Sequence, residues 1–210
     1  MIGASLRRTA EQRFVLGRGR FLDDLAPAGC LHLGVIRSTH AHARVVAVRL
    51  DAARALPGVA AAWAAADLPE VPEAMPSAFS PGKKTWGQSI LVRDVARFAG
   101  EPVAVVVADT PSRLADALEA VSVEYAPLPT LARVDAAYTS ATKLHDGWND
   151  NTAFVTKGSM GDVEAALATA HVVVRERFRH GRLAAVPIET RGVVAYTEGT
   201  TLVVWSSTQS

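Results

Sequence analysis

Cysteine is almost missing from this chain of 210 residues, because Cys30 is the only one. That scarcity excludes an internal disulfide and any cysteine-ligated cluster held by this chain alone. Long apolar runs are missing too: the longest, such as Val103–Ala108, suit a buried strand and fall far short of a membrane span. No apolar stretch follows the two arginines near the N-terminus, so no secretory signal is visible and the predicted location is cytoplasmic.

An excess of charge of one sign is also lacking. The chain has 22 basic and 21 acidic residues, for a formal net charge of +1, and they are spread along its length. This balance gives no electrostatic footprint for nucleic acid or for an anionic lipid surface. Apolar residues make up 49% of the chain and charged residues 20%, which is typical of a globular protein with a substantial core. The length allows one large or two small domains.

The first half of the chain predicts a mixed α/β domain behind a polar, arginine-rich leader, residues 1–30. Runs rich in valine, isoleucine and alanine predict strands, and capping residues with prolines predict helices. The predicted strands are 31–37, 43–50, 58–63, 103–108 and 121–125, and the predicted helices are 51–57 and 111–120. In chain order, the strand 103–108, the helix 111–120 and the strand 121–125 predict a βαβ unit with a right-handed crossover.

The second half is less regular at first. Residues 69–87 are rich in proline, serine and glycine and predict a loop that lines a channel or meets a partner. A polar, proline-rich connection follows at 127–151, and we expect a domain boundary near Asn151. Beyond it the pattern predicts three features: a helix that begins after Gly161-Asp162, a long strand over 171–178, and a hairpin of strands 192–197 and 201–205 turning at Glu198-Gly199.

Several residues near the N-terminus could serve a site, and each also has a structural interpretation. His40 and His42 lie two apart, so on a strand they would share a face and could bind one metal. A zinc site needs three or four ligands, however, and hydrogen-bonded imidazoles in a strand-edge turn fit the pattern better. Gly17-Arg-Gly-Arg20 could bind a phosphate but lacks the preceding strand and following helix of a phosphate loop, so we expect a packing or interface segment. A small buried role suits Cys30 better than a nucleophilic one.

The C-terminal third holds an acid and an amide of interest. Glu189, two residues before Arg191, must find a partner or shift its pKa, and binding to a backbone amide or an arginine fits it better than catalysis. Gln209 follows the last predicted strand in Trp205-Ser-Ser-Thr-Gln209 and could hydrogen-bond an oxo or carbonyl oxygen. A terminal glutamine is more often simply solvated. Because the sequence ends one residue later, either the chain ends in a frayed tail, or it is cut at a functional edge that something else completes.

Taken together, eight segments in a fixed order make the chain similar to one family, over almost its whole length. The segments are Gly17-Arg-Gly-Arg-Phe-Leu-Asp-Asp24, Arg37-Ser-Thr-His-Ala-His-Ala-Arg44, Leu56-Pro-Gly-Val59, Gly100-Glu-Pro-Val-Ala-Val-Val-Val-Ala108, Val123-Glu-Tyr-Ala-Pro-Leu-Pro129, Gly161-Asp-Val163, Pro187-Ile-Glu-Thr-Arg-Gly192 and Trp205-Ser-Ser-Thr-Gln209. The chain resembles the N-terminal part of the molybdenum-cofactor subunit of the xanthine dehydrogenase, aldehyde oxidase and aerobic carbon monoxide dehydrogenase family.

The resemblance implies a fold class, α/β (α+β), and a division into parts. Residues 1–30 would be an extended leader, 31–131 an α/β hammerhead domain, 132–150 a linker, and 151–210 the incomplete start of a molybdopterin-binding domain. It also implies a molybdenum–molybdopterin cofactor, in the cytosine dinucleotide form, that is shared with a C-terminal molybdenum-binding polypeptide. Gln209 would hydrogen-bond an oxygen ligand of the molybdenum. Electrons would leave through 2Fe–2S clusters and FAD on an iron–sulfur subunit and a flavin subunit.

Two hypotheses about function follow from the resemblance. In the first, the chain is the N-terminal piece of a molybdenum hydroxylase large subunit. It would contribute to hydroxylation of an aldehyde, purine or N-heterocycle with oxygen from water, or to oxidation of carbon monoxide. The Gly-rich loop and the catalytic glutamate of the family lie downstream of residue 210, so the chain is expected to be inactive alone. In the second, it is a non-catalytic hammerhead module that acts in binding or assembly.

Overall fold

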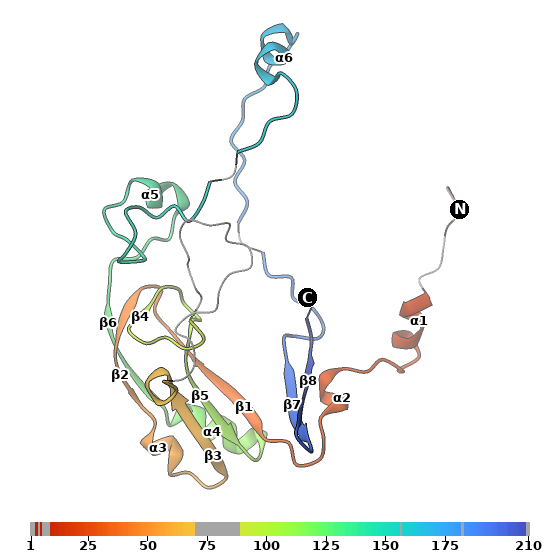
Figure 1. Ribbon diagram of the computed structural model, residues 1–210, viewed down its shortest axis with the longest axis vertical. Helices are drawn as coiled ribbons and strands as arrows, with labels where there is room; N and C mark the ends of the chain where they lie inside the picture. Colours follow the sequence, from red (N-terminus) through yellow and green to blue (C-terminus); the bar gives the residue numbers. More distant parts are fainter. Residues whose placement is uncertain are drawn as a thin grey trace. The chain divides into compact units, whose positions relative to one another are not determined.

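The computed structural model describes residues 3, 5, 9–69, 89–155, 157–181 and 183–208, and these fall into two units (Figure 1). One unit is Leu31–Ala170, and the other joins Met1–Cys30 to His171–Ser210. The predicted loop 69–87 lies almost wholly outside the described residues. Within the described ranges, no helix combines the length and the apolar character that a membrane span requires.

The first sheet of the unit Leu31–Ala170 has three strands in the order β1-β5-β3, and both pairings are antiparallel. Its elements are β1 (His32–Arg37), β3 (Val59–Ala64), β5 (Pro102–Ala108) and the helix that follows β5, α4 (Pro111–Glu119). The α4 helix contacts all three strands. It begins as the sequence predicts, because the Thr110 side chain accepts a hydrogen bond from the Arg113 amide at 3.3 Å and Pro111 occupies the first turn.

Small residues let the helix approach the sheet closely. Ala104, Val106 and Ala117 are fully buried in the core between them. At Gly34 on β1, a Cβ atom would lie only 2.8 Å from Leu118 Cδ1 of the helix, so a larger residue there would force the leucine side chain to move. This close packing explains why the predicted strands and helix assemble as two layers.

The second sheet has the order β4-β2-β6, again with antiparallel pairs only. Its strands are β2 (Ala43–Arg49), β4 (Val95–Ala96) and β6 (Ser122–Pro127). The prediction of a βαβ unit is therefore wrong: α4 connects β5 in one sheet to β6 in the other. Both edges of β5 are already paired, with β1 and β3, so β6 pairs with β2 instead. The buried apolar residues of this unit form two clusters. Ile36 and Val48 pack against both clusters and so join the two sheets.

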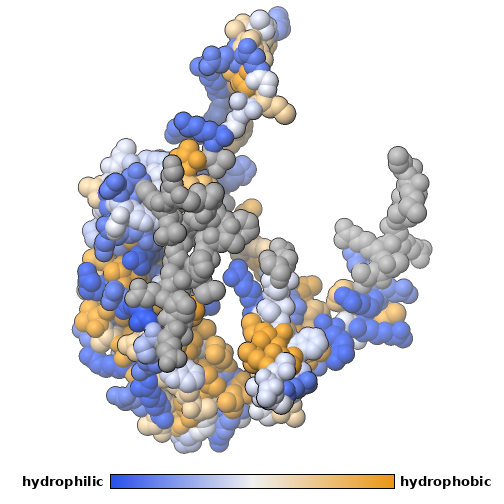
Figure 2. Space-filling view, viewed as in Figure 1, coloured by the Kyte–Doolittle hydropathy of each residue, from blue (hydrophilic) through white to orange (hydrophobic). Residues whose placement is uncertain are grey.

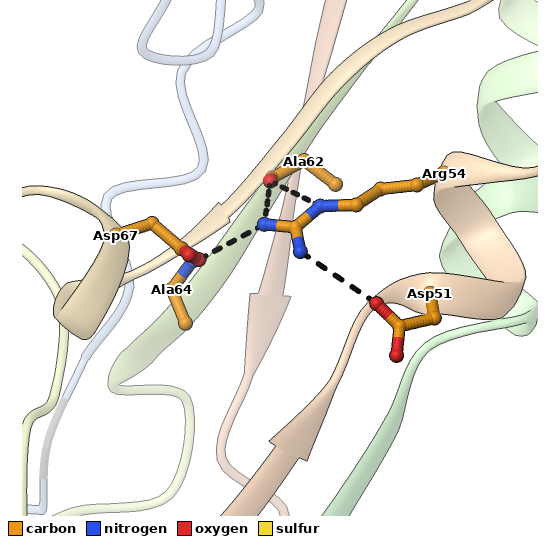
Figure 3. A network of polar contacts seen from close by, with 5 residues as sticks. All are labelled: Asp51, Arg54, Ala62, Ala64 and Asp67. Carbon is orange, nitrogen blue, oxygen red and sulfur yellow. Dashed lines mark hydrogen bonds and ion pairs between the residues drawn. The ribbon is translucent and has the colours of Figure 1, made fainter.

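A polar network fixes the short helix α3 (Asp51–Arg54) to the end of β3 (Figure 3). Arg54 donates two hydrogen bonds to the Ala62 carbonyl, at 3.1 Å from Nε and 2.7 Å from Nη2. Its Nη2 also donates to Asp67 Oδ2 at 3.1 Å, in the 3-10 turn η1 (Ala65–Asp67). The same Asp67 oxygen accepts the Ala64 amide at 2.8 Å, so one carboxylate organises the whole turn.

The connection after the second sheet carries two short helices, α5 (Val134–Thr139) and α6 (Val163–Thr169). The first was not predicted from the sequence. The second confirms its prediction, and Asp162 Oδ1 accepts the Ala165 amide at 2.9 Å as the N-cap.

The other unit combines the leader with the end of the chain. It contains α1 (Thr9–Val15), α2 (Leu22–Leu25), β7 (Val193–Glu198) and β8 (Thr201–Ser206). The last two form the predicted antiparallel hairpin, which turns at Gly199 with a φ of 58°. The hairpin carries exposed apolar side chains, among them Val193, Leu202 and Val204. Figure 2 shows an apolar patch in the region of β7 and β8.

The predicted strand over residues 171–178 is wrong, because 172–181 take no regular secondary structure. Its valines and its alternating pattern favour a strand, but strand geometry is stable only when a neighbouring segment satisfies the backbone hydrogen bonds. No other segment of the described chain pairs with it, and Val172, Val174 and Phe178 are exposed. The fold is thus α+β, with two small sheets in one unit and a hairpin in the other.

Candidate functional site

The end of β8 is tied to the segment that leads into β7, and Ser207 makes the connection. The hydroxyl of Ser207 donates to the Thr190 carbonyl at 3.0 Å and accepts the Gly192 amide at 2.9 Å. The Ser207 amide donates in turn to the Gly192 carbonyl at 3.2 Å. These three bonds fix the course of the chain beyond the strand. Gln209, the predicted cofactor-binding residue, lies two residues further on and outside the described residues.

Glu189 has a structural partner, as the sequence favoured. Its Oε1 accepts a hydrogen bond from the backbone amide of Leu22, the first residue of α2, at 2.8 Å. Glu189 is half-buried, whereas its neighbours Ile188 and Thr190 are exposed. The two ends of this bond are 167 residues apart in the chain. The carboxylate therefore attaches the leader to the segment that Ser207 also holds.

The leader also packs against this segment at Gly192. A Cβ atom there would lie 2.7 Å from Leu22 Cδ1, so the absence of a side chain admits the leucine. Within the leader, Phe14 and Phe21 lie with their ring centroids 6.0 Å apart, and a Cβ at Gly19 would be 2.7 Å from the Phe14 ring. Gly19 thus has a packing role, in line with the expectation that Gly17–Arg20 is a packing or interface segment.

The paired histidines lie in the other unit, and both imidazoles have structural partners. His42 is buried, and its Nδ1 lies 2.7 Å from the Pro129 carbonyl. His40 lies 3.1 Å from the Thr39 hydroxyl and packs against the Tyr125 ring, with centroids 4.7 Å apart. The prediction of hydrogen-bonded imidazoles in a strand-edge turn is confirmed. In the part of the chain that the structure describes, no three His, Cys, Asp or Glu side chains group as metal ligands.

A shallow hollow on the connection was not foreseen from the sequence. It has a volume of about 190 Å³ and is lined by Leu144, His145, Trp148, Asn151 and Ala153. The His145 and Trp148 rings stack with centroids 4.3 Å apart. Burial, with a smaller contribution from the Arg97 guanidinium, lowers the pKa of His145, and Asp146 opposes this shift. Cofactor and drug-sized pockets are commonly 300–1,000 Å³, so we assign the hollow a structural role.

The structure therefore brings together Leu22, Glu189, Gly192 and Ser207, in the unit that leads to Gln209. Only Glu189 among them stood out in the sequence. Ser207 could have been noticed as a hydroxyl just after a strand, but its partner carbonyl and amide could not. The candidate site is thus the end of β8, where Ser207 is bonded to the segment that contains Thr190 and Gly192, and Glu189 of the same segment accepts the Leu22 amide.

Two family models match the chain. The first is described as "Aldehyde oxidase and xanthine dehydrogenase, a/b hammerhead domain" and matches residues 16–129. The second is described as "Molybdopterin cofactor-binding domain" and matches residues 144–210. The second range contains β7, β8, Glu189 and Ser207, so the candidate site lies within the part that resembles a cofactor-binding domain.

Individual relatives agree with these matches. The chain is 33% identical to the nicotine 6-hydroxylase large subunit of Paenarthrobacter nicotinovorans, over 100% of this chain and 26% of that protein. It is 32% identical to the carbon monoxide dehydrogenase large chain of Afipia carboxidovorans, over 92% of this chain and 25% of that protein. Among solved structures, quinoline 2-oxidoreductase of Pseudomonas putida 86 matches with a TM-score of 0.85 and 37% identity, over 99% of this chain and 27% of that one. The chain therefore spans about a quarter of the length of these relatives.

Proposed function

The chain belongs to the aldehyde oxidase and xanthine dehydrogenase family, and from this premise we propose that it is the N-terminal part of a molybdenum hydroxylase large subunit. In this proposal it works in the cytoplasm within a multi-subunit complex and is inactive by itself. Its leader, residues 1–30, would precede a hammerhead domain at 31–131 and a linker at 132–150. Residues 151–210 would begin the molybdopterin-binding domain, which a C-terminal molybdenum-binding polypeptide completes.

The observation that carries the proposal is the position of the candidate site at the end of β8. It lies in the range that matches a molybdopterin cofactor-binding domain, and in the sequence its hydroxyl side chains are followed by Gln209. The Ser207 hydroxyl already donates its proton to the Thr190 carbonyl, so the neutral donor proposed for an oxygen ligand of a metal is the Gln209 amide. The carboxylate of Glu189, on the segment that Ser207 holds, is already engaged by the Leu22 amide. The donor set therefore fits hydrogen bonding to the cofactor rather than direct coordination of its metal.

In the proposed reaction, each residue of this chain has a supporting task. Gln209 would donate a hydrogen bond from its side-chain amide to an oxygen ligand of the molybdenum and so help to hold the cofactor. Ser207, two residues earlier in the chain, would hold the backbone that leads to it. When bound, molybdenum–molybdopterin, in the cytosine dinucleotide form, supplies a two-electron oxidation in which water provides the oxygen atom. The catalytic glutamate would lie in the C-terminal polypeptide.

The proposed partners follow from the same scheme. An iron–sulfur subunit with 2Fe–2S clusters and a flavin subunit with FAD would take up the two electrons. The substrate would be a small molecule, either an aldehyde, purine or N-heterocycle, or carbon monoxide. Relatives named for nicotine and for carbon monoxide support this range.

The test is to express the tagged chain together with the polypeptides encoded beside it and to purify whatever assembles. We expect molybdenum in the purified complex and oxidation of a family substrate coupled to a dye. Gln209→Ala should lower turnover by about 10- to 100-fold, as the loss of outer hydrogen bonds to metal ligands commonly does. Ser210→Ala is the matched control, and its turnover should stay at the wild-type level.

One result would overturn the proposal. If the chain purifies as a monodisperse monomer that recruits no other polypeptide and no molybdenum, it is not part of such an enzyme. The rival hypothesis, a non-catalytic binding module, predicts a complex that forms but contains no molybdenum.

A further inference from the structure

The leader carries a group of exposed aromatic and arginine side chains. Phe14 is 45% exposed, Phe21 is exposed too, and their ring centroids lie 6.0 Å apart. The Arg13 guanidinium lies over the Phe14 ring, 4.8 Å from its centroid. Arg18 and Arg20 are exposed, and neither side chain has a hydrogen bond or ion pair with the residues that the structure describes. We call these five residues the leader cluster.

A turn at Gly17 builds the leader cluster. The helix α1 ends there, because the Gly17 amide donates to the Phe14 carbonyl at 3.0 Å and the Arg18 amide donates to the Arg13 carbonyl at 2.7 Å. These two bonds, with a φ of 66° at Gly17, are a common glycine ending of a helix. Gly19 then lets the chain pass the Phe14 ring, since a Cβ atom there would lie 2.7 Å from Phe14 Cδ1. Both glycines therefore have a role in the turn that carries the two arginines.

The leader cluster is also anchored to the rest of its unit. Leu22 directly follows Phe21, its amide donates to Glu189 Oε1 at 2.8 Å, and its side chain packs at Gly192. Asp24 Oδ2 accepts the Phe21 amide at 2.9 Å. A surface that is ordered before association loses less conformational entropy when a partner binds, and this favours affinity.

We propose that the leader cluster is a docking surface for another protein subunit, one that presents carboxylates around an apolar centre. Aromatic and arginine side chains are enriched among the residues that contribute most to protein–protein affinity. Leu16, 54% exposed and next to the turn, adds apolar area. Between Glu11 and Asp23 the chain has three arginines and no acidic residue, so the matching surface must be acidic. This inference rests on the proposed function for the complex that supplies the partner.

Two other anionic partners fit the leader cluster less well. Nucleic acids and anionic lipid surfaces present phosphates, which attract arginines but repel carboxylates. Three acids flank the cluster in the sequence, namely Glu11, Asp23 and Asp24. A folded protein surface carries both signs of charge, so it can face the arginines with carboxylates and the flanking acids with basic or neutral groups.

The experiment uses the complex obtained by expressing the tagged chain with the polypeptides encoded beside it. Arg18→Glu combined with Arg20→Glu reverses two charges of the cluster, and Phe14→Ala removes a ring. Arg175→Glu combined with Arg177→Glu is the matched control, because these are exposed arginines two residues apart in the same unit. The readouts are the polypeptides that co-purify, the dissociation constant of each on dilution of the complex, the salt dependence of that constant, and the molybdenum content.

A second set of samples tests the arrangement of the leader cluster and the chemistry of its partner. Gly19→Ala keeps every side chain of the cluster, but its methyl would lie 2.7 Å from Phe14 Cδ1, so the ring must move. Gly147→Ala is the control, because its methyl has nothing within 4 Å. A photo-reactive phenylalanine analogue at position 14 identifies the surface that this ring touches in the complex.

We expect Phe14→Ala to weaken the binding of one polypeptide by about 30-fold, as the loss of a central interface residue commonly does. The reversal at Arg18 and Arg20 should weaken the same binding by at least about tenfold. Wild-type affinity should fall as the salt concentration rises, because salt screens exposed charges. Gly19→Ala should bind more weakly than Gly147→Ala, and the cross-link should join position 14 to a peptide of that polypeptide that contains Asp or Glu.

Several results would overturn the inference. One is wild-type affinity for every polypeptide after the reversal at Arg18 and Arg20, and another is an equal loss in the Arg175 and Arg177 control. A third is an unchanged complex together with binding of the chain to phosphatidylserine–phosphatidylcholine vesicles, or to duplex DNA, that the reversal abolishes. If Phe14→Ala does not fold, the reversal decides, since both of its arginines are exposed.

Failure of the proposed function gives a different result. A complex without molybdenum that loses a polypeptide in the reversed variant would refute the proposed function and support the docking surface. A complex with molybdenum that keeps every polypeptide in that variant would do the opposite. A chain that recruits no other polypeptide would overturn both.

Discussion

The side chain of Asn151 accepts a hydrogen bond from the backbone amide of Leu144, seven residues earlier in the chain, at 3.1 Å. Its Nδ2 donates at the same time to the carbonyls of Ala137 and Thr142, at 3.1 and 2.9 Å. One amide side chain therefore holds together the stretch of chain that runs from α5 to the hollow beside His145. The arrangement uses both ends of the amide, so neither alanine nor aspartate can replace it.

Asn151→Ala should lower the free energy of unfolding by about 1–3 kcal/mol, because three partly buried backbone groups lose their partner. Asn151→Asp should be at least as damaging, since a carboxylate cannot donate and would face two carbonyl oxygens. Urea unfolding of the purified chain measures both changes. Asn149→Ala is the control at an exposed asparagine and should change stability by less than about 0.5 kcal/mol. Equal stability of the Ala, Asp and wild-type proteins would contradict this account of the connection.

His145 should make the stability of this connection depend on pH. Its pKa is lowered below the ordinary value of about 6.5, first by burial and then by Arg97. The folded state therefore binds the proton less tightly than the unfolded state. The stability that the neutral ring contributes is fully present above about pH 6.5 and is lost as the pH falls through the lowered pKa.

His145→Phe tests this, because it keeps a ring to stack on Trp148 but cannot be protonated. Urea unfolding between pH 5 and pH 8 should show the wild type losing stability relative to the variant as the pH falls. Profiles that run parallel over the whole range would exclude a contribution from His145.

Arg54 and its two aspartates allow a comparison of geometry within one network. Arg54→Ala should cost about 1–2 kcal/mol, because the Ala62 carbonyl loses its donor in a partly buried place and Asp67 loses an exposed one. Asp51→Ala should have almost no effect, since the Asp51 carboxylate is 99% exposed and lies 3.8 Å from Arg54. The order of stability, measured by urea unfolding, should be wild type, Asp51→Ala, Arg54→Ala. An equal cost for the two variants would contradict the larger role assigned to the hydrogen bonds that Arg54 donates to Ala62 and Asp67.

Local signals predicted much of this fold correctly. The helix after Thr110-Pro111 and the hairpin turning at Glu198-Gly199 depend on residues a few positions apart, and both confirm their predictions. The pairing of β6 was predicted wrongly, because strand order depends on which edges are free, and that is a property of the assembled sheet. Residues 171–178 have the pattern of a strand but no neighbour to pair with in the described chain.

In the candidate site, too, local features could be predicted from the sequence and long-range contacts could not. The sequence singled out Glu189 as an acid that needs a partner, and it favoured a backbone amide or an arginine. It could not identify Leu22, because no local pattern connects residues 167 positions apart. The role of Gln209 rests on the family resemblance and stays a prediction.

The contact between Gly192 and the Leu22 side chain gives a last prediction. This apolar contact lies beside the hydrogen bond from the Leu22 amide to Glu189. Gly192→Ala places a Cβ 2.7 Å from Leu22 Cδ1, closer than two carbons can approach, so the leucine must move. Removing that leucine end should remove the conflict. We therefore expect Gly192→Ala to expose the leader to limited proteolysis between α1 and α2, and Leu22→Ala to expose it less.

The double variant is the decisive measurement, because contacting residues are expected to be non-additive. Gly192→Ala combined with Leu22→Ala should be cleaved no faster than Leu22→Ala alone, since the added methyl then meets open space. Gly147→Ala is the control, because its added methyl has nothing within 4 Å and causes no backbone strain. Gly199→Ala would not serve, because the positive φ of Gly199 makes any side chain there strained. Additive cleavage rates in the double variant would mean that Gly192→Ala disturbs β7 itself rather than the place where Leu22 packs.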